Sequence, residues 1–376
     1  MIYLDHNATT PIDPAVTAAM LPYLSHAFGN PSSEHQYGVE PRAALATARR
    51  EIAGLIGAGD GRIVFTGSGS EADNLAIRGV VLAATSESPH VITQVTEHPA
   101  VLQACRALER WHGVDVTYLP VDGSGLVDPG DLDAAMTPQT VLVSIMAANN
   151  ETGALQPVAD LARIARDYDV LFHCDAAQHI GKLPFDVDAQ GIDLVTVVGH
   201  KMYAPKGVGA LWVRSGVPLE PLVYGGGQEY GVRAGTESVA LAVGLGAAAR
   251  LASGHVGDPY RIQKLRDALQ DRLSEALPGR VVLNGPSGRR LPNTLNLSIE
   301  GTIASDVLRN APELAASTGS ACHSGDPAPS PVLTAMGVDR DRALAAIRLS
   351  LGRWTTVEDV DTAVQQLAAA TLTGGD

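Results

Sequence analysis

The chain has 376 residues, of which 45% are hydrophobic, so it is long enough for a full hydrophobic core and for two domains. Lys and Arg together number 27 against 41 Asp and Glu, and the resulting net charge of −14 argues against a general nucleic-acid-binding surface. No apolar run reaches the roughly 20 residues of a membrane span, and the first residues lack a basic segment followed by an apolar signal core. We therefore expect a soluble, cytoplasmic protein that binds neither nucleic acid directly nor a membrane.

Strand-like and helix-like patterns alternate along most of the chain. This alternation predicts an α/β fold, a mostly parallel sheet flanked by helices on both faces. The segment at 209–213 is expected to be a return strand at the sheet edge. In chain order, the expected elements are helix 14–24, helix 43–56, strand 62–66, a helix that starts at 71, strand 90–95, helix 100–111, strand 114–119, a helix around 132, strand 141–146, helix 158–169, a strand that ends at 175, strand 194–198, strand 209–213 and helix 238–252.

Small and turn residues cluster at 254–258, after a long expected helix, and indicate a domain boundary. We expect an N-terminal segment, 1–14, that packs with the small domain, a large domain at 15–255, and a smaller α+β C-terminal domain at 256–376. The expected elements of the small domain are helix 260–277, strands 280–283, 294–299 and 347–351, and helix 357–370.

Lys201 and Asp175 each stand at the end of an apolar strand, the position where open α/β sheets bind ligands. A partly desolvated lysine is a nucleophilic amine that can form a Schiff base with an aldehyde. An aspartate on a neighbouring strand can pair with a pyridinium nitrogen, so the two residues fit pyridoxal phosphate. The alternative is a buried Lys–Asp pair that only holds the sheet together.

Other strand ends also carry polar side chains. The turn at 67–70, between a strand and a helix start, presents backbone N–H groups suited to a phosphate, although such turns are often only connections. His98 can stack on a flat cofactor and move protons, or it can simply bond to the backbone at a helix start. Asn150 follows another strand. We expect these endings to converge on one rim with Asp175 and Lys201.

The three cysteines, Cys105, Cys174 and Cys322, are an odd number without CxxC spacing, so we expect neither a disulfide framework nor a metal site. Cys105 lies in a helical pattern and Cys174 in an apolar strand, as small hydrophobic residues do. Cys322 lies in a loop rich in small residues and proline. It is therefore either a reactive thiol or an exposed spectator.

Nine short motifs are distributed from one end of the chain to the other. They are Asp5-His-Asn-Ala-Thr-Thr-Pro11, Gly29-Asn-Pro31, Glu71-Ala-Asp-Asn-Leu75, Glu97-His98, Asn149-Asn-Glu151, His173-Cys-Asp-Ala-Ala-Gln178, Gly199-His-Lys201, Arg233-Ala-Gly-Thr236 and Gly319-Ser-Ala-Cys322. Together they resemble the motif set of the pyridoxal-phosphate cysteine desulfurases. The resemblance implies a homodimer of fold type I in the class V aminotransferase superfamily.

The resemblance implies a role for each matching residue. Lys201 would form the Schiff base, and Asp175 would pair with the pyridinium nitrogen. His98 would stack on the ring and carry protons, and Gln178 would bond the phenolic oxygen. The remaining implied roles are phosphate binding by Gly69, Ser70 and His200 and, from the second subunit, Thr236; contact with cofactor and substrate carboxylate by Asn150; bidentate binding of that carboxylate by Arg348; and nucleophilic attack on sulfur by Cys322.

By this resemblance, the reaction converts L-cysteine to L-alanine and leaves a persulfide on Cys322, which a sulfur-acceptor protein then takes. Val198 stands where desulfurases usually have a serine, and the residues that follow Cys322 are similar to those of selenocysteine lyases. L-Selenocysteine is therefore the alternative substrate. An aminotransferase is a more remote alternative, against which the Cys322 loop argues.

Overall fold

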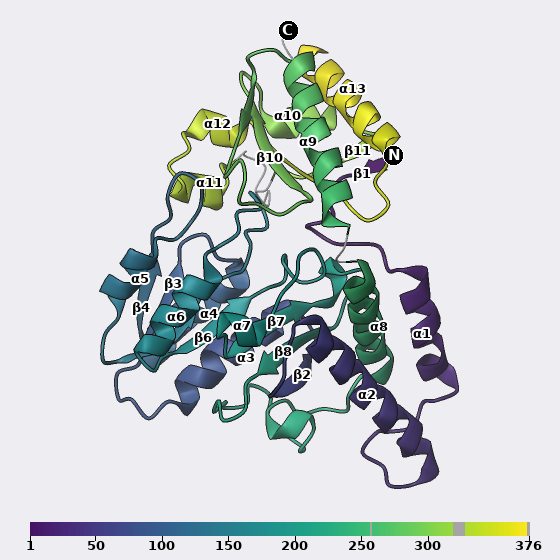
Figure 1. The fold of residues 1–376 in the computed structure, drawn as a ribbon, viewed down its shortest axis with the longest axis vertical. Helices are drawn as coiled ribbons and strands as arrows, with labels where there is room; N and C mark the ends of the chain where they lie inside the picture. Colours follow the sequence, from purple (N-terminus) through teal and green to yellow (C-terminus); the bar gives the residue numbers. More distant parts are fainter. Residues whose placement is uncertain (256–257, 319–327, 374–376) are drawn as a thin grey trace.

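A seven-stranded sheet organises the larger part of the molecule (Figure 1). The computed structural model describes residues 1–255, 258–318 and 328–373. Five neighbouring strands are parallel to one another, and the strand order is β2-β8-β7-β6-β5-β3-β4. The strands are β2 (Arg62–Thr66), β3 (His90–Gln94), β4 (Asp115–Leu119), β5 (Thr140–Ser144), β6 (Leu171–Asp175), β7 (Leu194–Val198) and β8 (Gly209–Val213).

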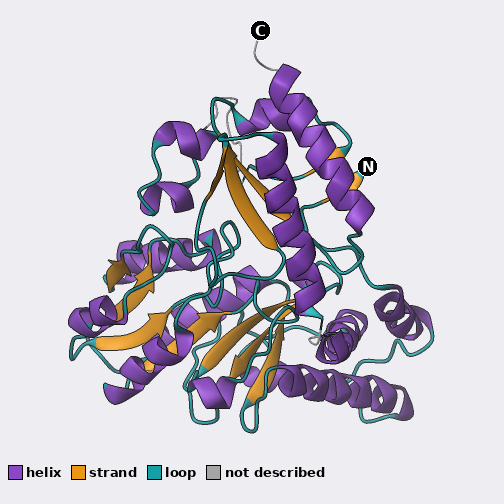
Figure 2. Cartoon of the chain, turned by 45° about the horizontal axis from the view of Figure 1, so that its top comes forward, coloured by secondary structure: helices purple, strands orange, loops and turns teal. Residues whose placement is uncertain are grey.

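Helices cover both faces of this sheet (Figure 2). Side chains alternate between the two faces of a strand, so Ile63 and Phe65 of β2 belong to one apolar core and Val64 to the other. The first core also contains side chains of α1 (Pro14–Ser25), α2 (Gln36–Leu55), α5 (Pro129–Ala135), α6 (Val158–Asp167), α7 (Val187–Gln190) and α8 (Val239–His255). The second contains side chains of α3 (Gly69–Ala83) and α4 (Pro99–His112).

A second, smaller body packs around a three-stranded antiparallel sheet, β12-β10-β9. Both ends of the described chain lie at this body (Figure 1). There, β1 (Ile2–Tyr3) pairs in parallel with β11 (Leu314–Ala315), and Leu4 enters the core. The other elements are α9 (Pro259–Ala276), β9 (Val281–Leu283), β10 (Thr294–Ile299), α10 (Ala304–Arg309), α11 (Pro331–Ala335), α12 (Arg340–Leu344), β12 (Ala346–Ser350) and α13 (Val357–Thr373).

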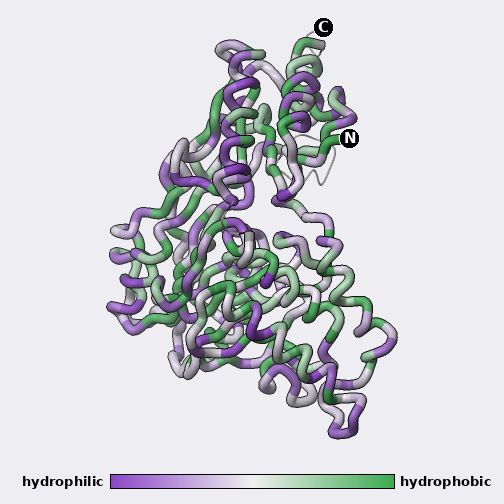
Figure 3. The backbone as a smooth tube through the Cα atoms, turned by 45° about the vertical axis from the view of Figure 1, so that its right-hand side comes forward, coloured by the Kyte–Doolittle hydropathy of each residue, from purple (hydrophilic) through white to green (hydrophobic). Residues whose placement is uncertain are grey.

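The hydropathy of the chain follows this arrangement, with hydrophobic stretches along the interior of the larger body (Figure 3). In the described part of the chain, no single helix is long and apolar enough to cross a membrane. The predicted fold class, a mainly parallel sheet between helices, is confirmed. The proposed domain boundaries stay a prediction, and residues 256 and 257 within the expected junction are outside the described residues.

Two details of the predicted elements were wrong. The strand at 209–213 is not at the sheet edge, because β8 lies between β2 and β7 and is antiparallel to both. The helix expected from 43 begins at Gln36, although Gly38 and Pro41 are unfavourable in helices. Both residues are buried on the same helix face as Leu45, Ala48 and Ile52, so the packing of this face offsets the backbone hydrogen bond that Pro41 cannot donate.

Candidate functional site

A cavity of about 340 Å³ lies at the carboxyl ends of β3, β5, β6 and β7. These strands are neighbours, so the residues that follow them meet along one edge. Nine of the predicted site residues line this cavity: Gly69, Ser70, His98, Asn150, Asp175, Gln178, His200, Lys201 and Arg348. The convergence expected from the strand ends is therefore present in the structure.

Lys201 lies at the end of a single 3-10 turn (Gly199–Lys201) that directly follows β7. Its Nζ donates hydrogen bonds to the backbone oxygens of Asn7 (2.6 Å) and Ala8 (2.7 Å). Burial, together with the positive charge of Arg348, lowers the pKa of Lys201 to about 8. An amine held on neutral carbonyls with a depressed pKa is suited to nucleophilic attack on a carbonyl compound.

Asp175 ends β6, and the Ala177 N–H donates to its Oδ1 at 2.9 Å. Burial raises the pKa of Asp175, while His98 and Lys201 nearby act in the opposite direction. A buried carboxylate of this kind needs a cationic partner in order to stay ionised. A protonated pyridine nitrogen would be such a partner.

Sequence reasoning assigned no role to Asp73, which also lines the cavity. Burial and the charge of Asp175 raise the pKa of Asp73 well above its ordinary value, and the same two causes raise that of Glu97. Asp73 lies one helical turn after Gly69 on α3, and this i, i+4 spacing is the signal that could have identified it. These raised pKa values favour the neutral forms of Asp73 and Glu97.

The turn before α3 has the geometry of an anion site. Ser68 caps the helix by accepting a hydrogen bond from the Glu71 N–H at 3.1 Å, and the first amides of the helix have no intrahelical partner. A Cβ atom at Gly69 would lie 2.4 Å from Cγ2 of Val198, so only glycine lets this turn approach β7. His200 lies two residues after Val198; its ring contacts Thr9 Oγ1 at 3.2 Å, and burial lowers the pKa of His200 to about 4.

His98 combines the two interpretations left open by the sequence. Its Nδ1 accepts a hydrogen bond from the Ala100 N–H at 3.1 Å and so caps α4, while the ring also lines the cavity. Because Nδ1 is the acceptor, the neutral ring carries its proton on Nε2. Burial lowers the pKa of His98, which favours this neutral form.

Arg348, on β12 of the small body, also lines the cavity. Its Nη2 donates to Asp5 Oδ1 (2.7 Å), and its Nη1 donates to the Asn150 backbone oxygen (3.2 Å). Its buried Nε has no hydrogen-bond partner among the described residues. Each Nη nitrogen carries a second hydrogen, so the guanidinium keeps donors for a carboxylate.

Two predicted residues remain, and the structure describes one of them. Thr236 is exposed and does not line the cavity. Cys322 lies outside the described residues. The other two cysteines, Cys105 and Cys174, are buried, and burial raises the pKa of the Cys105 thiol to about 12.

Comparison with known proteins agrees with this geometry. The model of the class-V aminotransferase family matches residues 2–363. The cysteine desulfurase IscS of Dictyoglomus turgidum is 45% identical over 367 residues, which cover 96% of this chain and 92% of the relative. This chain belongs to the cysteine desulfurases of the class-V aminotransferase family. The family resemblance seen in the sequence is thereby confirmed.

Solved structures of related proteins have the same fold. A NifS-like protein matches with a TM-score of 0.92 at 35% identity, over 99% of both chains. SspA, solved in complex with cysteine, matches with a TM-score of 0.84 at 37% identity, over 95% of this chain and all of that one.

The cysteine desulfurase family implies pyridoxal phosphate as cofactor, and the walls of this cavity fit that group. They offer an amine for its aldehyde and a buried carboxylate for its ring nitrogen. For its phosphate they offer the start of a helix, where the close packing leaves room only for glycine. The three functional groups come from Lys201, Asp175 and the turn at Gly69, on separate elements that the fold brings to one place.

Glu151 gives this desulfurase a pH-dependent contact beside the cavity. Ser330, the N-cap of α11, donates to Glu151 Oε2 at 2.5 Å, and burial raises the pKa of Glu151 to about 7. The folded protein therefore binds this proton more tightly than the unfolded chain, so stability is lost as pH rises from about 4.5 to about 7. Between these pH values the free energy of unfolding should fall less in Glu151→Gln than in the parent, by on the order of 1–3 kcal/mol.

The measurement is urea unfolding at pH 5, 6, 7 and 8. Glu275→Gln is the control, because Glu275 is exposed on α9. In the Glu151→Gln protein, the difference in unfolding free energy between pH 5 and pH 8 should shrink relative to the parent and the control. Equal slopes in all three proteins would show that Glu151 titrates as an ordinary carboxyl group.

Proposed function

We propose that this protein converts L-cysteine to L-alanine with pyridoxal phosphate and leaves the sulfur as a persulfide on Cys322. The observation that carries the proposal is the placement of Lys201 and Asp175 after neighbouring strands in one cavity, with Arg348 at its wall. Lys201 would hold the aldehyde carbon, and Asp175 the ring nitrogen. Gly69, Ser70 and His200 would hold the phosphate, and Gln178 the phenolic oxygen. When bound, the cofactor supplies an electron sink for the substrate α-carbon.

The protein's own groups would supply binding and proton movement. Arg348 and Asn150 would hold the substrate carboxylate, with Asp5 fixing the guanidinium plane through its contact with Nη2. Lys201, with its pKa near 8, can take a proton from the α-carbon and return one close to neutral pH. His98 would cover the ring and, with the proton on Nε2, serve as a donor.

Sulfur transfer would be the role of Cys322. Its thiolate attacks the substrate sulfur, the carbon–sulfur bond breaks, and the electron pair stays with the carbon, which gains a proton to become the methyl group of alanine. The products, alanine and a persulfide, contain all atoms of the two thiols, so no external oxidant or reductant is needed. A sulfur-acceptor protein would remove the outer sulfur atom.

The proposed active site also includes Thr236 from a second subunit. Thr236 follows the glycine-rich segment 225–235 and is exposed, away from the cavity of its own chain. We propose that it contacts the cofactor phosphate in a partner's cavity within a homodimer.

Release of alanine tests the proposed function. Purified protein, saturated with pyridoxal phosphate, should form alanine and, with a thiol reductant, sulfide from L-cysteine. L-Selenocysteine tests the alternative suggested by the residues after Cys322. Fast release of alanine from selenocysteine with almost none from cysteine would make the enzyme a selenocysteine lyase. Alanine from neither substrate would refute the proposal.

A further inference from the structure

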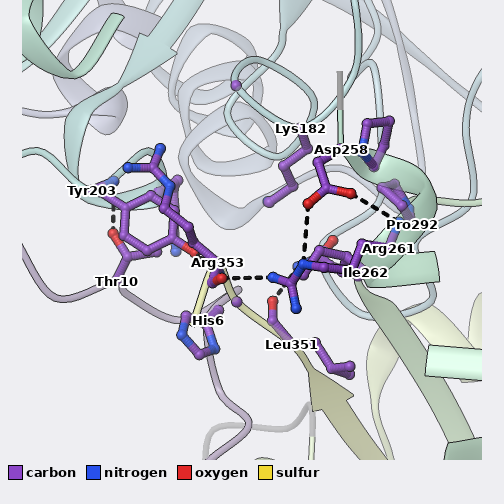
Figure 4. Close-up of a pocket in the computed structure, with 15 residues that line it drawn as sticks. His6, Thr10, Lys182, Tyr203, Asp258, Arg261, Ile262, Pro292, Leu351 and Arg353 are labelled. Carbon is purple, nitrogen blue, oxygen red and sulfur yellow. Dashed lines mark hydrogen bonds and ion pairs between the residues drawn. The ribbon is translucent and has the colours of Figure 1, made fainter. Parts of the chain in front are cut away.

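Lys182 is a second lysine near the active site with no assigned role. It lies in the loop after β6, four residues beyond Gln178. Two of the other lysines, Lys206 and Lys264, are exposed, as lysines usually are. Lys182 is partly buried and lines a second cavity, of about 310 Å³ (Figure 4). Lys201 also lines this second cavity. Such burial of a lysine calls for an explanation.

The contacts of Lys182 are with Gln178. Its Nζ donates to the side-chain Oε1 of Gln178 at 2.6 Å and to the backbone oxygen of the same residue at 2.9 Å. Gln178 in turn lines the first cavity, which Lys182 does not. Lys182 thus holds the Gln178 side chain by a hydrogen bond, and Gln178 lines the proposed cofactor site.

These contacts fix which way the Gln178 amide points. Its Nε2 donates to the backbone oxygen of Asn7 at 2.9 Å, and its Oε1 accepts from Lys182. A flipped amide would place Oε1 against the Asn7 oxygen, two acceptors in contact, and would remove the acceptor from Lys182. The orientation with Nε2 toward Asn7 is therefore strongly favoured, and it leaves the second N–H of Nε2 as a donor.

The same Asn7 oxygen also accepts the hydrogen bond from Lys201 Nζ at 2.6 Å. One continuous network therefore joins Lys182, Gln178, Asn7 and Lys201. Burial lowers the pKa of Lys182 well below its ordinary value. Protonated or neutral, the amine keeps at least two N–H bonds, enough for both contacts with Gln178.

We propose that Lys182 is a positioning residue that locks the Gln178 amide with an N–H directed at the phenolic oxygen of the bound cofactor. This inference rests on the proposed function. A phenolic oxygen that carries negative charge is stabilised by an N–H donor and repelled by an amide oxygen. Without Lys182, Oε1 of Gln178 would lose its hydrogen-bond donor. The Gln178 amide could then flip, and its N–H would face the phenolic oxygen for a smaller fraction of the time.

The test uses the enzyme loaded with pyridoxal phosphate and follows its visible absorption against pH. The titrating proton is shared between the Lys201 nitrogen and the phenolic oxygen, and a weaker donor at that oxygen makes the proton harder to remove. Lys182→Met should raise the midpoint of the titration by about one pH unit and weaken cofactor binding roughly tenfold. Lys264→Met, an exposed lysine on α9, should leave both unchanged.

A double-variant cycle separates positioning from a general structural effect. Gln178→Met should raise the midpoint at least as much as Lys182→Met, and the double variant should equal Gln178→Met within about 0.3 pH units, because Lys182 then has nothing to position. Full addition of the two shifts would overturn the proposal, and so would a midpoint for Lys182→Met equal to that of the parent.

Lys182→Arg keeps the test decisive if Lys182→Met does not fold. The second cavity gives room for the longer guanidinium, which retains N–H donors for Gln178, so the midpoint should stay near that of the parent. A shift as large as that of Gln178→Met would contradict the proposal. If the parent protein shows no visible band with pyridoxal phosphate, the proposed function itself fails. A normal parent titration with an unaffected Lys182→Met protein would refute only the role of Lys182.

Discussion

Replacement of Lys201 by alanine is expected to lower alanine formation from cysteine by at least about a thousandfold. The amine is the group in this cavity that can bind the cofactor aldehyde covalently, and its pKa of about 8 also suits it to proton transfer. The purified parent loaded with pyridoxal phosphate should be yellow and the variant should not, because that absorption depends on the bond between the Lys201 nitrogen and the cofactor. Absorption spectra and an alanine assay on the same samples measure both effects.

Two variants serve as controls for Lys201→Ala. Lys206→Ala removes an exposed lysine five residues away and should keep both colour and activity. Lys201→Arg keeps a positive charge but offers a guanidinium, which is a poor nucleophile at neutral pH, so it should be as inactive as alanine. A colourless parent protein that stays colourless after addition of pyridoxal phosphate would refute the role of Lys201 altogether.

Much of this cavity could be predicted because its residues follow parallel strands. A buried parallel strand is a short apolar run, so its end is visible in the sequence, and Asp175, Lys201 and His98 all stand at or just after such an end. The carboxyl ends of parallel strands share one edge of a sheet. The positions of these residues therefore follow from local pattern and topology without knowledge of any contact.

Other features depend on contacts between distant parts of the chain and leave no local pattern. The β8 strand was expected at the edge, and only the pairing with β2 places it inside the sheet. The bond between Ser330 and Glu151 joins residues 179 positions apart. Arg348 reaches the cavity from the small body, and it was assigned only through resemblance to a family. Lys182 could have been noticed from its i, i+4 spacing to Gln178, but such spacing has many other causes.

Replacement of Cys322 by serine should abolish alanine formation from cysteine, with a loss of more than about a hundredfold. Sulfur is a poor leaving group here, so it needs attack by a thiolate, and a serine hydroxyl is far less nucleophilic. Lys201, Asp175 and His98 are untouched, so binding of the cofactor and the early spectral change on adding cysteine should remain. The measurements are alanine release and stopped-flow absorption. Cys322 lies outside the described residues, so this expectation rests on the sequence.

The matched control is Cys105→Ala, which removes a buried thiol on α4 and should retain activity. Selenocysteine provides a second comparison on the same Cys322→Ser protein. The carbon–selenium bond is weaker than the carbon–sulfur bond, and a selenol is more acidic than a thiol, so selenium can leave with little help. Alanine release from selenocysteine should therefore survive in the variant that has lost activity on cysteine. Full activity of Cys322→Ser on cysteine would mean that sulfur leaves without a persulfide on this residue, and the proposed transfer step would be wrong.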